Sequence, residues 1–395
     1  MKDKLGFFTK EEMGVSITNC VSCKLYKGCN SPKMKVSGKG ESKILIIGEA
    51  PGKTEDEQGH QFIGSAGDVL MDGLEANGLY RSDCWFINAV NCRPPENRTP
   101  TKREIKLCSP RVEEVIRKKK PHIIILLGNI ALQSFMLERF KKQLGGINKW
   151  RGFAIPEHSV NAWVMPMFHP SYVMRSEGIP AIRKVFTQDL KNVRKYINKP
   201  LPKKENYAIK IENDPSEVIR MLDYIIQYKP LLAFDYETTG IKPHAKGHKI
   251  FCCGICYFNK NVGTVFELKN EDVIQYWQLI LTDKDIKKTA HNIKFEEAWS
   301  KEILKTKVRG WKWDSMIAAH IIDNRPKITS LEFQAYVNFG QQDYSSHIDK
   351  YLKSDGGGNN FNTIHDADPM EIMEYCGMDA LLQYKLAKKQ MEEMK

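Results

Sequence analysis

Strand-like and helix-like patterns alternate along this sequence, and the alternation breaks at one segment, NKPLPKKENY, at residues 198–207. Two prolines and a run of charged residues leave that segment without a hydrophobic period. A chain of 395 residues is also too long for one ordinary hydrophobic core and long enough for two. We therefore expect two domains, residues 1–197 and 208–395, joined by a linker at residues 198–207.

The first half predicts a sheet covered by helices. The sequence KILIIGEAPG, which starts at Lys43, indicates a short buried strand that ends in a Gly/Pro turn. Further strands are expected at residues 84–90, 122–127 and 162–167, and helices at residues 66–77, 101–119, 129–137 and 180–197. This alternation predicts an α/β fold with helices on both faces of the sheet. Sites in such sheets lie at the carboxyl ends of the strands, where GEAPG, Asn88 and His169 fall.

The second half predicts another α/β domain. PLLAFDYETTG indicates a strand that ends in a turn, and KIFCCGICYF and VGTVFEL are typical of a paired hairpin. From about Asn270 to the end we expect alternating helices. Cys252, Cys253 and Cys256 alternate with apolar residues on the expected strand, and no matching ligand pair follows, so we do not interpret them as metal ligands.

The excess of positive over negative charge lies entirely in the first half. Residues 1–200 contain 33 Lys and Arg against 20 Asp and Glu, or +13, and the remainder contains 27 against 28, or −1. This asymmetry fits a polyanion-binding module joined to one whose carboxylates hold cations, and a solubilising surface explains it equally well. No apolar run of eighteen residues occurs, and the N-terminus lacks a secretory signal, so we expect no membrane association and a cytoplasmic location.

Ten cysteines in such a chain indicate metal ligands or buried small residues more than disulfides. Cys20 and Cys23 form a CxxC pair, and Cys92 and Cys108 follow at a distance. If the N-terminal arm folds back, four thiolates converge. On chemistry alone this set suits zinc and an iron–sulfur cluster equally well.

The ordered motifs CxxC, GEAPG, QFIGSAG, INAVNCRPPENRTP, a later Cys and HPS resemble the family 4 uracil-DNA glycosylases over about residues 17–197. The resemblance implies an α/β/α sandwich in which Cys20, Cys23, Cys92 and Cys108 hold a 4Fe–4S cluster. By the same resemblance Cys29 and Cys84 are not ligands, and they are interpreted as small residues that fill space.

A uracil flipped out of DNA needs an aromatic platform, an amide for its Watson–Crick edge and a group that stabilises negative charge as the glycosidic bond breaks. By resemblance Phe62 is the stacking residue, Asn88 reads the uracil, and His169 donates a hydrogen bond to the developing anion. Glu49, with the backbone of the turn from Gly48 to Gly52, matches the pocket wall.

Glu55 matches an acidic position near the reacting sugar, where a carboxylate can orient the attacking water. Which acid holds that water stays open at this point. The residues after the histidine suggest a hypothesis for DNA binding, in which Arg175 contacts a phosphate and one of three neighbours fills the gap left by the flipped base: Tyr172, Val173 or Met174.

A second set of acids lies in the other half. Asp235 and Glu237 alternate on one expected strand, so both carboxylates face the same side. A two-metal phosphodiesterase needs further carboxylates and a group that positions water. HNIKFEEAW supplies Asn292 with an acid four residues on, and EYCGMDA supplies Tyr375 with Asp379 on the same helical face.

The ordered set DYET, HNIKFE and YxxxD resembles the RNase H-like 3′-5′ proofreading exonucleases of family A DNA polymerases, in the subclass with tyrosine in the third motif. The resemblance covers about residues 205–392. It implies that Tyr375 orients water, that Asn292 contributes to substrate binding, and that two Mg²⁺ or Mn²⁺ ions are held by Asp235, Glu237, Glu296 and Asp379.

Two acids near these motifs need a separate interpretation. The family usually has Asp at the position of Glu296, and the longer side chain can alter how its metal is held. Glu297 should point about 100° away around the helix. Asp314 is interpreted as a helix N-cap.

The two resemblances together predict an enzyme that excises uracil from DNA and trims 3′ ends. The alternative is a non-catalytic DNA-binding or uracil-sensing replisome module. The pairing of domains loosely resembles the N-terminal part of certain bacteriophage polymerases. The expected partners are therefore DNA and a polymerase on a separate polypeptide or in a replisome.

Overall fold

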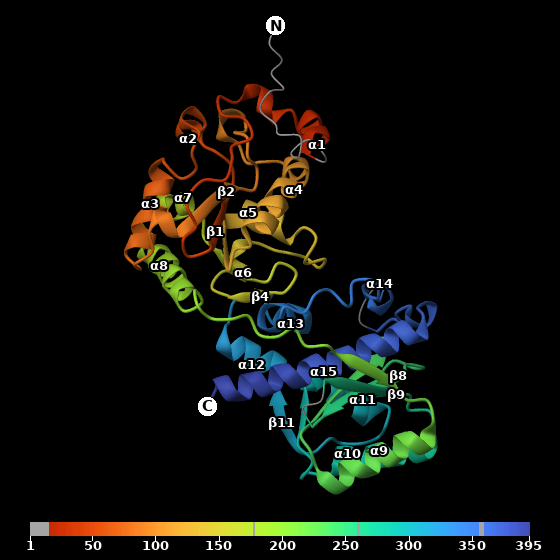
Figure 1. The fold of residues 1–395 in the computed structure, drawn as a ribbon. Helices are drawn as coiled ribbons and strands as arrows, with labels where there is room; N and C mark the ends of the chain where they lie inside the picture. Colours follow the sequence, from red (N-terminus) through yellow and green to blue (C-terminus); the bar gives the residue numbers. More distant parts are fainter. Residues whose placement is uncertain (1–15, 177, 259–260, 355–358) are drawn as a thin grey trace. The chain divides into compact units, whose positions relative to one another are not determined.

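The computed structural model describes residues 16–176, 178–258, 261–354 and 359–395 (Figure 1). The first fourteen residues, on which the expectation of no secretory signal rests, lie outside the described part. The chain divides into two compact units, Met1–Lys203 and Lys204–Lys395. The division falls inside the segment 198–207, where the hydrophobic period stops.

The first unit is built on a five-stranded sheet in the order β2-β1-β3-β5-β4. Strands β2, β1, β3 and β5 are parallel, and β4 pairs antiparallel with β5 at the edge. The strand bounds are β1 Ile44–Gly48, β2 Cys84–Asn88, β3 Ile123–Leu127, β4 Ile155–Glu157 and β5 Ala162–Met167. Every residue of β1 and β3 is buried, as expected of parallel strands covered on both faces.

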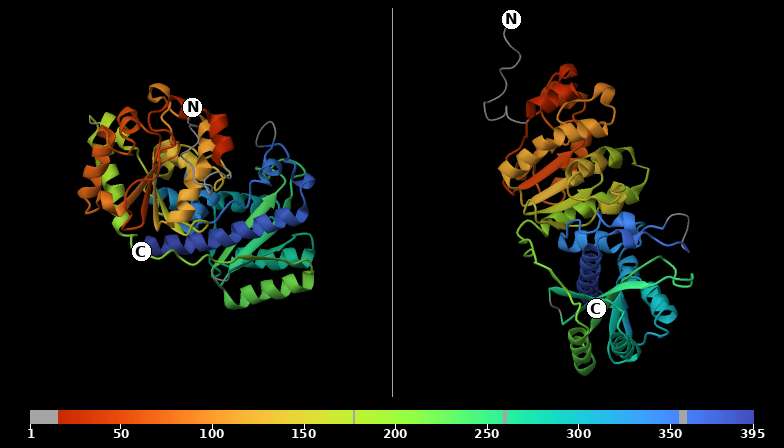
Figure 2. Two further views of the ribbon diagram at one scale, coloured as in Figure 1. Left: turned by 45° about the horizontal axis from the view of Figure 1, so that its top comes forward. Right: turned by 90° about the vertical axis from the view of Figure 1, so that its right-hand side faces the viewer.

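Helices cover both faces of this sheet, as Figure 2 shows. On one face α3 and α8 pack their Leu70, Leu74, Phe186 and Leu190 side chains against alternate strand residues such as Ile46. On the other face α5 contacts β1 and β3, and α4 packs against α5. The α-helix bounds are α1 Ser16–Cys23, α2 Lys53–Gln58, α3 Ser65–Glu75, α4 Lys102–Lys119, α5 Gly128–Met136, α6 Ile147–Trp150, α7 Pro170–Arg175 and α8 Pro180–Arg194.

The second unit holds a six-stranded sheet in the order β11-β10-β7-β8-β9-β6. Its strands are β6 Ala208–Ile211, β7 Leu232–Thr238, β8 Ile250–Tyr257, β9 Val262–Phe266, β10 Lys288–Ala290 and β11 Trp311–Asp314. Strand β8 is antiparallel to β7 and β9, so the expected hairpin is present. Strands β10 and β11 correct the expectation of helices alone after residue 270, because runs of three or four residues are too short to show a period.

Helices α9, α10 and α11 cover one face of this sheet, and α13 and α15 cover the other (Figure 1). Gly254 of β8 lets α15 approach closely, because a methyl group there would stand 2.5 Å from the Cys376 carbonyl oxygen. The α-helix bounds are α9 Pro215–Tyr228, α10 Glu271–Thr282, α11 Ile293–Glu302, α12 Ser315–Ile322, α13 Leu331–Phe339, α14 Asp349–Leu352 and α15 Pro369–Glu393.

Both units are mixed α/β domains, so the predicted fold class is confirmed. Within the described ranges, no helix combines the length and the apolar character needed to cross a membrane.

Candidate functional site

Three residues predicted to form a base pocket meet at the carboxyl edge of the first sheet. Gly48 ends β1 and Asn88 ends β2, and the two are paired in register. A methyl group added to Gly48 would stand 2.5 Å from Asn88 Oδ1 and 2.6 Å from Phe62 Cζ. The lack of a side chain at Gly48 therefore lets the Asn88 amide and the Phe62 ring come together.

The Asn88 side chain has an unused donor. Asn88 is only 3% exposed, and its Nδ2 has no hydrogen-bond partner within the described part of the chain. A buried amide donor without a partner is costly, and such groups are rare in folded proteins. The amide is therefore positioned to pair with a ligand.

Phe62 is held in an uncommon backbone conformation by two charged side chains. Its φ of 54° lies in the left-handed region. Its N–H donates to Glu55 Oε1 at 2.5 Å, and its carbonyl accepts from Arg81 Nη1 at 3.1 Å. Arg81 Nη2 also donates to the Gln61 carbonyl at 2.6 Å. No sequence motif indicates a role for Arg81, because that role arises only from these contacts.

Both carboxylate oxygens of Glu55 bind the backbone. Besides holding Phe62, the side chain accepts from Gly52 N at 2.6 Å through Oε2. Glu55 occupies the third position of α2 and closes a capping arrangement on Gly52. The carboxylate at the position expected near the reacting sugar thus fixes the turn that carries Phe62.

His169 follows β5 and caps the N-terminus of α7. Its Nδ1 accepts from Ser171 N at 3.2 Å and lies 2.8 Å from Ser171 Oγ. A ring nitrogen that accepts from an N–H carries no proton, so the proton of the neutral ring is on Nε2. Burial, and to a lesser degree the charge of Arg175, lowers the pKa of His169 to about 4. The ring is therefore neutral at pH 7.

Glu49 and Arg175 lie near the same edge. Burial raises the pKa of Glu49, and the nearby Arg175 charge opposes that shift. The Arg175 charge also lowers the pKa of His169, so it acts on both groups. Val173 is 3% exposed and belongs to the hydrophobic core, which removes it from the three wedge candidates. Tyr172, at 40% exposed, and Met174 remain.

The four cysteines expected to hold a cluster line one cavity, between α1, α4 and the loop after β2: Cys20, Cys23, Cys92 and Cys108. The Asn91 N–H and side-chain amide lie 3.4 and 3.5 Å from Cys108 Sγ, and Lys33 N lies 3.2 Å from Cys92 Sγ. Burial raises the pKa of the Cys92 and Cys108 thiols, and these N–H groups oppose that rise by favouring the thiolate.

The other two cysteines of the first unit have different surroundings. Cys29 does not line the cavity, and its Sγ donates to the carbonyls of Leu25 at 3.2 Å and Arg93 at 3.4 Å. Cys84 lies in the hydrophobic core, where burial raises the pKa of its thiol to about 12.

A cluster of buried and half-buried acids lies beneath α15 in the second unit. Single ligand atoms of Asp235, Glu237 and Cys376 all lie within 4.8 Å of one another. Burial raises the pKa of both carboxyls well above the usual range. The Asp379 charge adds to the shift at Asp235, and the Asp235 charge adds to that at Glu237. Acids that repel in a buried space are the arrangement that a bound cation stabilises.

Glu296 and Asp379 face this cluster from two helices. Glu296 is 1% exposed, and its Oε2 lacks a hydrogen-bond partner among the described residues. Its pKa is raised well above normal by burial and then by Asp235. Asp379 Oδ1 accepts from Tyr344 Oη at 2.6 Å. Neither acid belongs to the set within 4.8 Å, so the four predicted ligands do not surround a single point.

Tyr375 stands beside the acids with a second tyrosine. Burial, followed by the Asp379 and Glu237 charges, raises the pKa of Tyr375 well above normal. The Tyr344 ring stacks on it with centroids 6.0 Å apart and planes at 28°. Tyr344 could not be predicted from the sequence, because no motif or period distinguishes it.

The remaining residues of the second motif are fixed by hydrogen bonds. Asn292 has a φ of 85°, a conformation that Asn tolerates, and its N–H donates to Asp314 Oδ1 at 3.3 Å. Asp314 caps α12 as expected, and its Oδ2 also accepts from Ile293 N at 2.9 Å in α11. Glu297 Oε2 accepts from Trp311 Nε1 at 2.8 Å, so this carboxylate is engaged elsewhere.

Comparison with known proteins identifies the family of each unit. Residues 34–191 match the model of the uracil DNA glycosylase superfamily, and residues 208–395 match that of a 3′-5′ exonuclease. The type-4 uracil-DNA glycosylase of Pyrobaculum aerophilum is 38% identical over 44% of this chain and 87% of its own length. That of Thermotoga maritima is 34% identical over 49% of this chain and 98% of its own. The chain belongs to the type-4 uracil-DNA glycosylase family.

In this chain the type-4 glycosylase domain is fused to a 3′-5′ exonuclease domain, which confirms the predicted pair of enzyme domains. A DNA polymerase of Bacillus phage SP01 is 24% identical over 92% of this chain, which spans 41% of that polymerase. Among solved structures, Trypanosoma brucei RNase D with RNA U12 aligns over 46% of this chain and 62% of its own, at 16% identity and a TM-score of 0.39.

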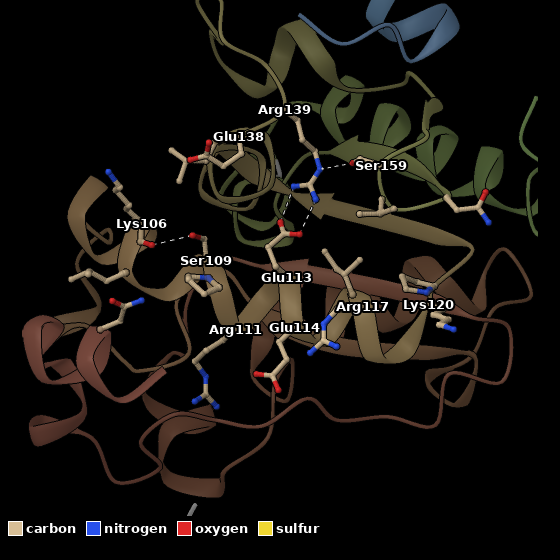
Figure 3. Close-up of a pocket in the computed structure, with 18 of the residues that line it drawn as sticks. Lys106, Ser109, Arg111, Glu113, Glu114, Arg117, Lys120, Glu138, Arg139 and Ser159 are labelled. Atoms are coloured by element: carbon tan, nitrogen blue, oxygen red, sulfur yellow. Dashed lines mark hydrogen bonds and ion pairs between the residues drawn. The ribbon is translucent and has the colours of Figure 1, made fainter. Parts of the chain in front are cut away.

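The type-4 glycosylase unit also carries a groove of about 1240 Å³ along α4 (Figure 3). Arg139 donates to the two oxygens of Glu113 at 2.7 and 2.8 Å and to Ser159 Oγ at 3.3 Å. Lys106 and Arg117 also line the groove. None of the described residues that line it belongs to the predicted base pocket, so the groove lies outside that site.

Proposed function

We propose that the chain excises uracil from DNA with its first unit and hydrolyses DNA 3′ ends with its second. The observation that carries the first activity is the unpartnered Nδ2 of buried Asn88, which lies beside the Phe62 ring. An amide pairs with the Watson–Crick edge of a flipped pyrimidine while an aromatic ring stacks on its face. These two groups therefore supply the recognition that uracil excision requires.

The chemistry of excision falls to His169 and Glu49. The Nε2–H of neutral His169 donates a hydrogen bond to the uracil O2 as negative charge develops there. Glu55 holds the turn with both oxygens, so the acid that orients the attacking water is Glu49. Its raised pKa makes the carboxylate a better base than an ordinary glutamate.

The four cavity cysteines fit an iron–sulfur cluster better than a single zinc ion. At a Zn–S bond of about 2.3 Å, tetrahedral thiolates lie about 3.8 Å apart. No three of the described cysteines have sulfurs within 4.8 Å of one another. Thiolates that each bind a different iron are spaced more widely, and the cluster would tie the N-terminal arm to the core. We propose that Cys20, Cys23, Cys92 and Cys108 hold it.

The acids of the second unit fit two divalent ions. Glu296 Oε2 has no hydrogen-bond partner among the described residues, and the pKa values of Asp235 and Glu237 are raised. A bound cation would supply the missing partner and stabilise the charged carboxylates. Bound Mg²⁺ or Mn²⁺ would supply Lewis-acid activation of water and of the phosphate. Tyr375 orients the attacking water, and Asn292, whose N–H donates to Asp314 Oδ1, begins the helix that carries Glu296.

One assay separates this proposal from a non-catalytic DNA-binding module. The protein is incubated with an oligonucleotide that carries uracil and a single-stranded 3′ end, with and without EDTA, and is then treated with alkali. We expect an alkali-labile site that persists in EDTA, because base excision uses no divalent ion, and 3′ trimming that EDTA abolishes. Intact substrate under every condition would contradict the proposal and favour the binding module.

We also propose that the chain acts in DNA replication beside a DNA polymerase. The similarity to a phage DNA polymerase extends over 92% of this chain and thus over both units, which supports this context. During replication, uracil excision and 3′ trimming would act on the same DNA.

A further inference from the structure

A cysteine lies among the proposed metal ligands of the exonuclease unit. Cys376 comes directly after Tyr375 on α15, and its Sγ lies 3.6 Å from the Asp235 carbonyl oxygen and 3.9 Å from Asp235 Oδ2. Ligand atoms of Asp235, Glu237 and Cys376 lie within 4.8 Å of one another. Cys376 is fully buried, so this sulfur faces the acids and not solvent.

The spacing suits one ion shared between sulfur and oxygen. For bonds of about 2.3 Å to sulfur and about 2.1 Å to oxygen, tetrahedral geometry places the two ligand atoms about 3.6 Å apart. The 3.9 Å between Cys376 Sγ and Asp235 Oδ2 is close to that value. A second observation points to a ligand here, because Glu296 Oε2 is buried without a partner in the described ranges, and its charge acts on Glu237.

We propose that Asp235, Glu237 and Cys376 form a mixed carboxylate–thiolate site that binds thiophilic ions such as Zn²⁺ or Cd²⁺ more tightly than Mg²⁺. On binding, the Cys376 thiol releases its proton to solvent and its sulfur coordinates the ion. Thiolate ligands select soft ions, whereas carboxylates alone suit Mg²⁺ and Mn²⁺. The site deepens the proposed exonuclease function and rests on it, and Cys376 makes that activity sensitive to thiophilic metals.

The first test measures inhibition of 3′ trimming by Cd²⁺ at a fixed Mg²⁺ concentration. We expect Cys376→Ser to raise the half-inhibiting Cd²⁺ concentration at least about tenfold, because a hydroxyl binds Cd²⁺ far more weakly than a thiolate. Cys376→Ala removes the sulfur without adding a hydroxyl and should give the same shift. Cys256→Ser is the matched control, because Cys256 is buried on the same strand as Cys252 and Cys253 but outside the acid cluster. Equal inhibition of all four proteins overturns the proposal.

The second test needs no nuclease activity. Cd²⁺ is titrated into each protein, and the ultraviolet charge-transfer band of Cd²⁺–thiolate bonds is recorded as the difference from Cys376→Ser, so that thiols elsewhere cancel. We expect the wild type and Cys256→Ser to show the same positive difference band. No difference band means that Cys376 binds no metal. If the difference band appears but the protein does not trim 3′ ends, the metal site stands and the proposed exonuclease function is rejected.

Discussion

Replacing Glu55 with Gln distinguishes a carboxylate that holds the pocket from one that activates water. Each Glu55 oxygen accepts a backbone hydrogen bond, at 2.6 Å from Gly52 and 2.5 Å from Phe62. Hydrogen bonds to a charged group contribute about 1.5–3 kcal/mol each. Glutamine keeps one acceptor and turns its NH₂ toward the other N–H, so the loss should be about 2–4 kcal/mol of unfolding free energy.

For a unit of this size that loss lowers the melting temperature by roughly 4–16 °C. Phe62 also leaves its left-handed conformation more easily, so KM for uracil-containing DNA should rise while the pH dependence of kcat stays unchanged. Thermal unfolding and steady-state excision kinetics measure both effects. Glu57→Gln, an exposed change on the same helix, is the control and should cost less than about 0.5 kcal/mol. A Glu55→Gln protein that is as stable as wild type but loses kcat and its acidic pH limb would refute this reasoning and make Glu55 the base.

Three further changes test other parts of the structure. Burial lowers the pKa of His169 from 6.5 to about 4, so between these pH values the unfolded chain binds more protons than the folded chain, and stability falls as the pH falls. In urea titrations, wild type should therefore lose more unfolding free energy than His169→Asn between pH 7 and 5. Equal losses in the two proteins would contradict the pKa shift. Cys108→Ser should lose the absorbance at about 400 nm and the bound iron, whereas Cys29→Ser should keep about four iron atoms per chain. Bound iron in both variants, or in neither, would reject the ligand assignment. Lys288 is fully buried, and its Nζ donates to the carbonyls of Asp283, Ile286 and Arg309. Lys288→Met should therefore lower the unfolding free energy, measured with denaturant, by about 3 kcal/mol. An unchanged unfolding midpoint would show that these hydrogen bonds contribute nothing to stability.

The fold was predictable where the signal is local. Strand β1 is a continuous apolar run, β7 begins with the apolar residues Leu232, Ala233 and Phe234, and Asp314 caps the helix that begins beside it. Strands β6, β10 and β11 were missed, because three or four residues carry too little pattern and their neighbours in the sheet are far away in the sequence.

The candidate sites also contain residues that motifs predict and residues whose roles depend on contacts across the fold. Phe62 and Asn88 were predicted through ordered motifs, and the structure brings them together at Gly48. Arg81, Tyr344 and Cys376 were missed, because each gains its role only from contacts across the fold: Arg81 with the Phe62 carbonyl, Tyr344 with Asp379, and Cys376 with Asp235. A single sequence carries no signal for such contacts.

We propose that this one chain holds two independent active sites. The direct measurement follows both reactions on one end-labelled oligonucleotide with an internal uracil, using wild type, Asn88→Ala and Asp235→Ala. We predict that Asn88→Ala loses excision and keeps 3′ trimming, and that Asp235→Ala keeps excision and loses trimming. Loss of both reactions in either variant, with the protein still folded, would contradict two separate sites.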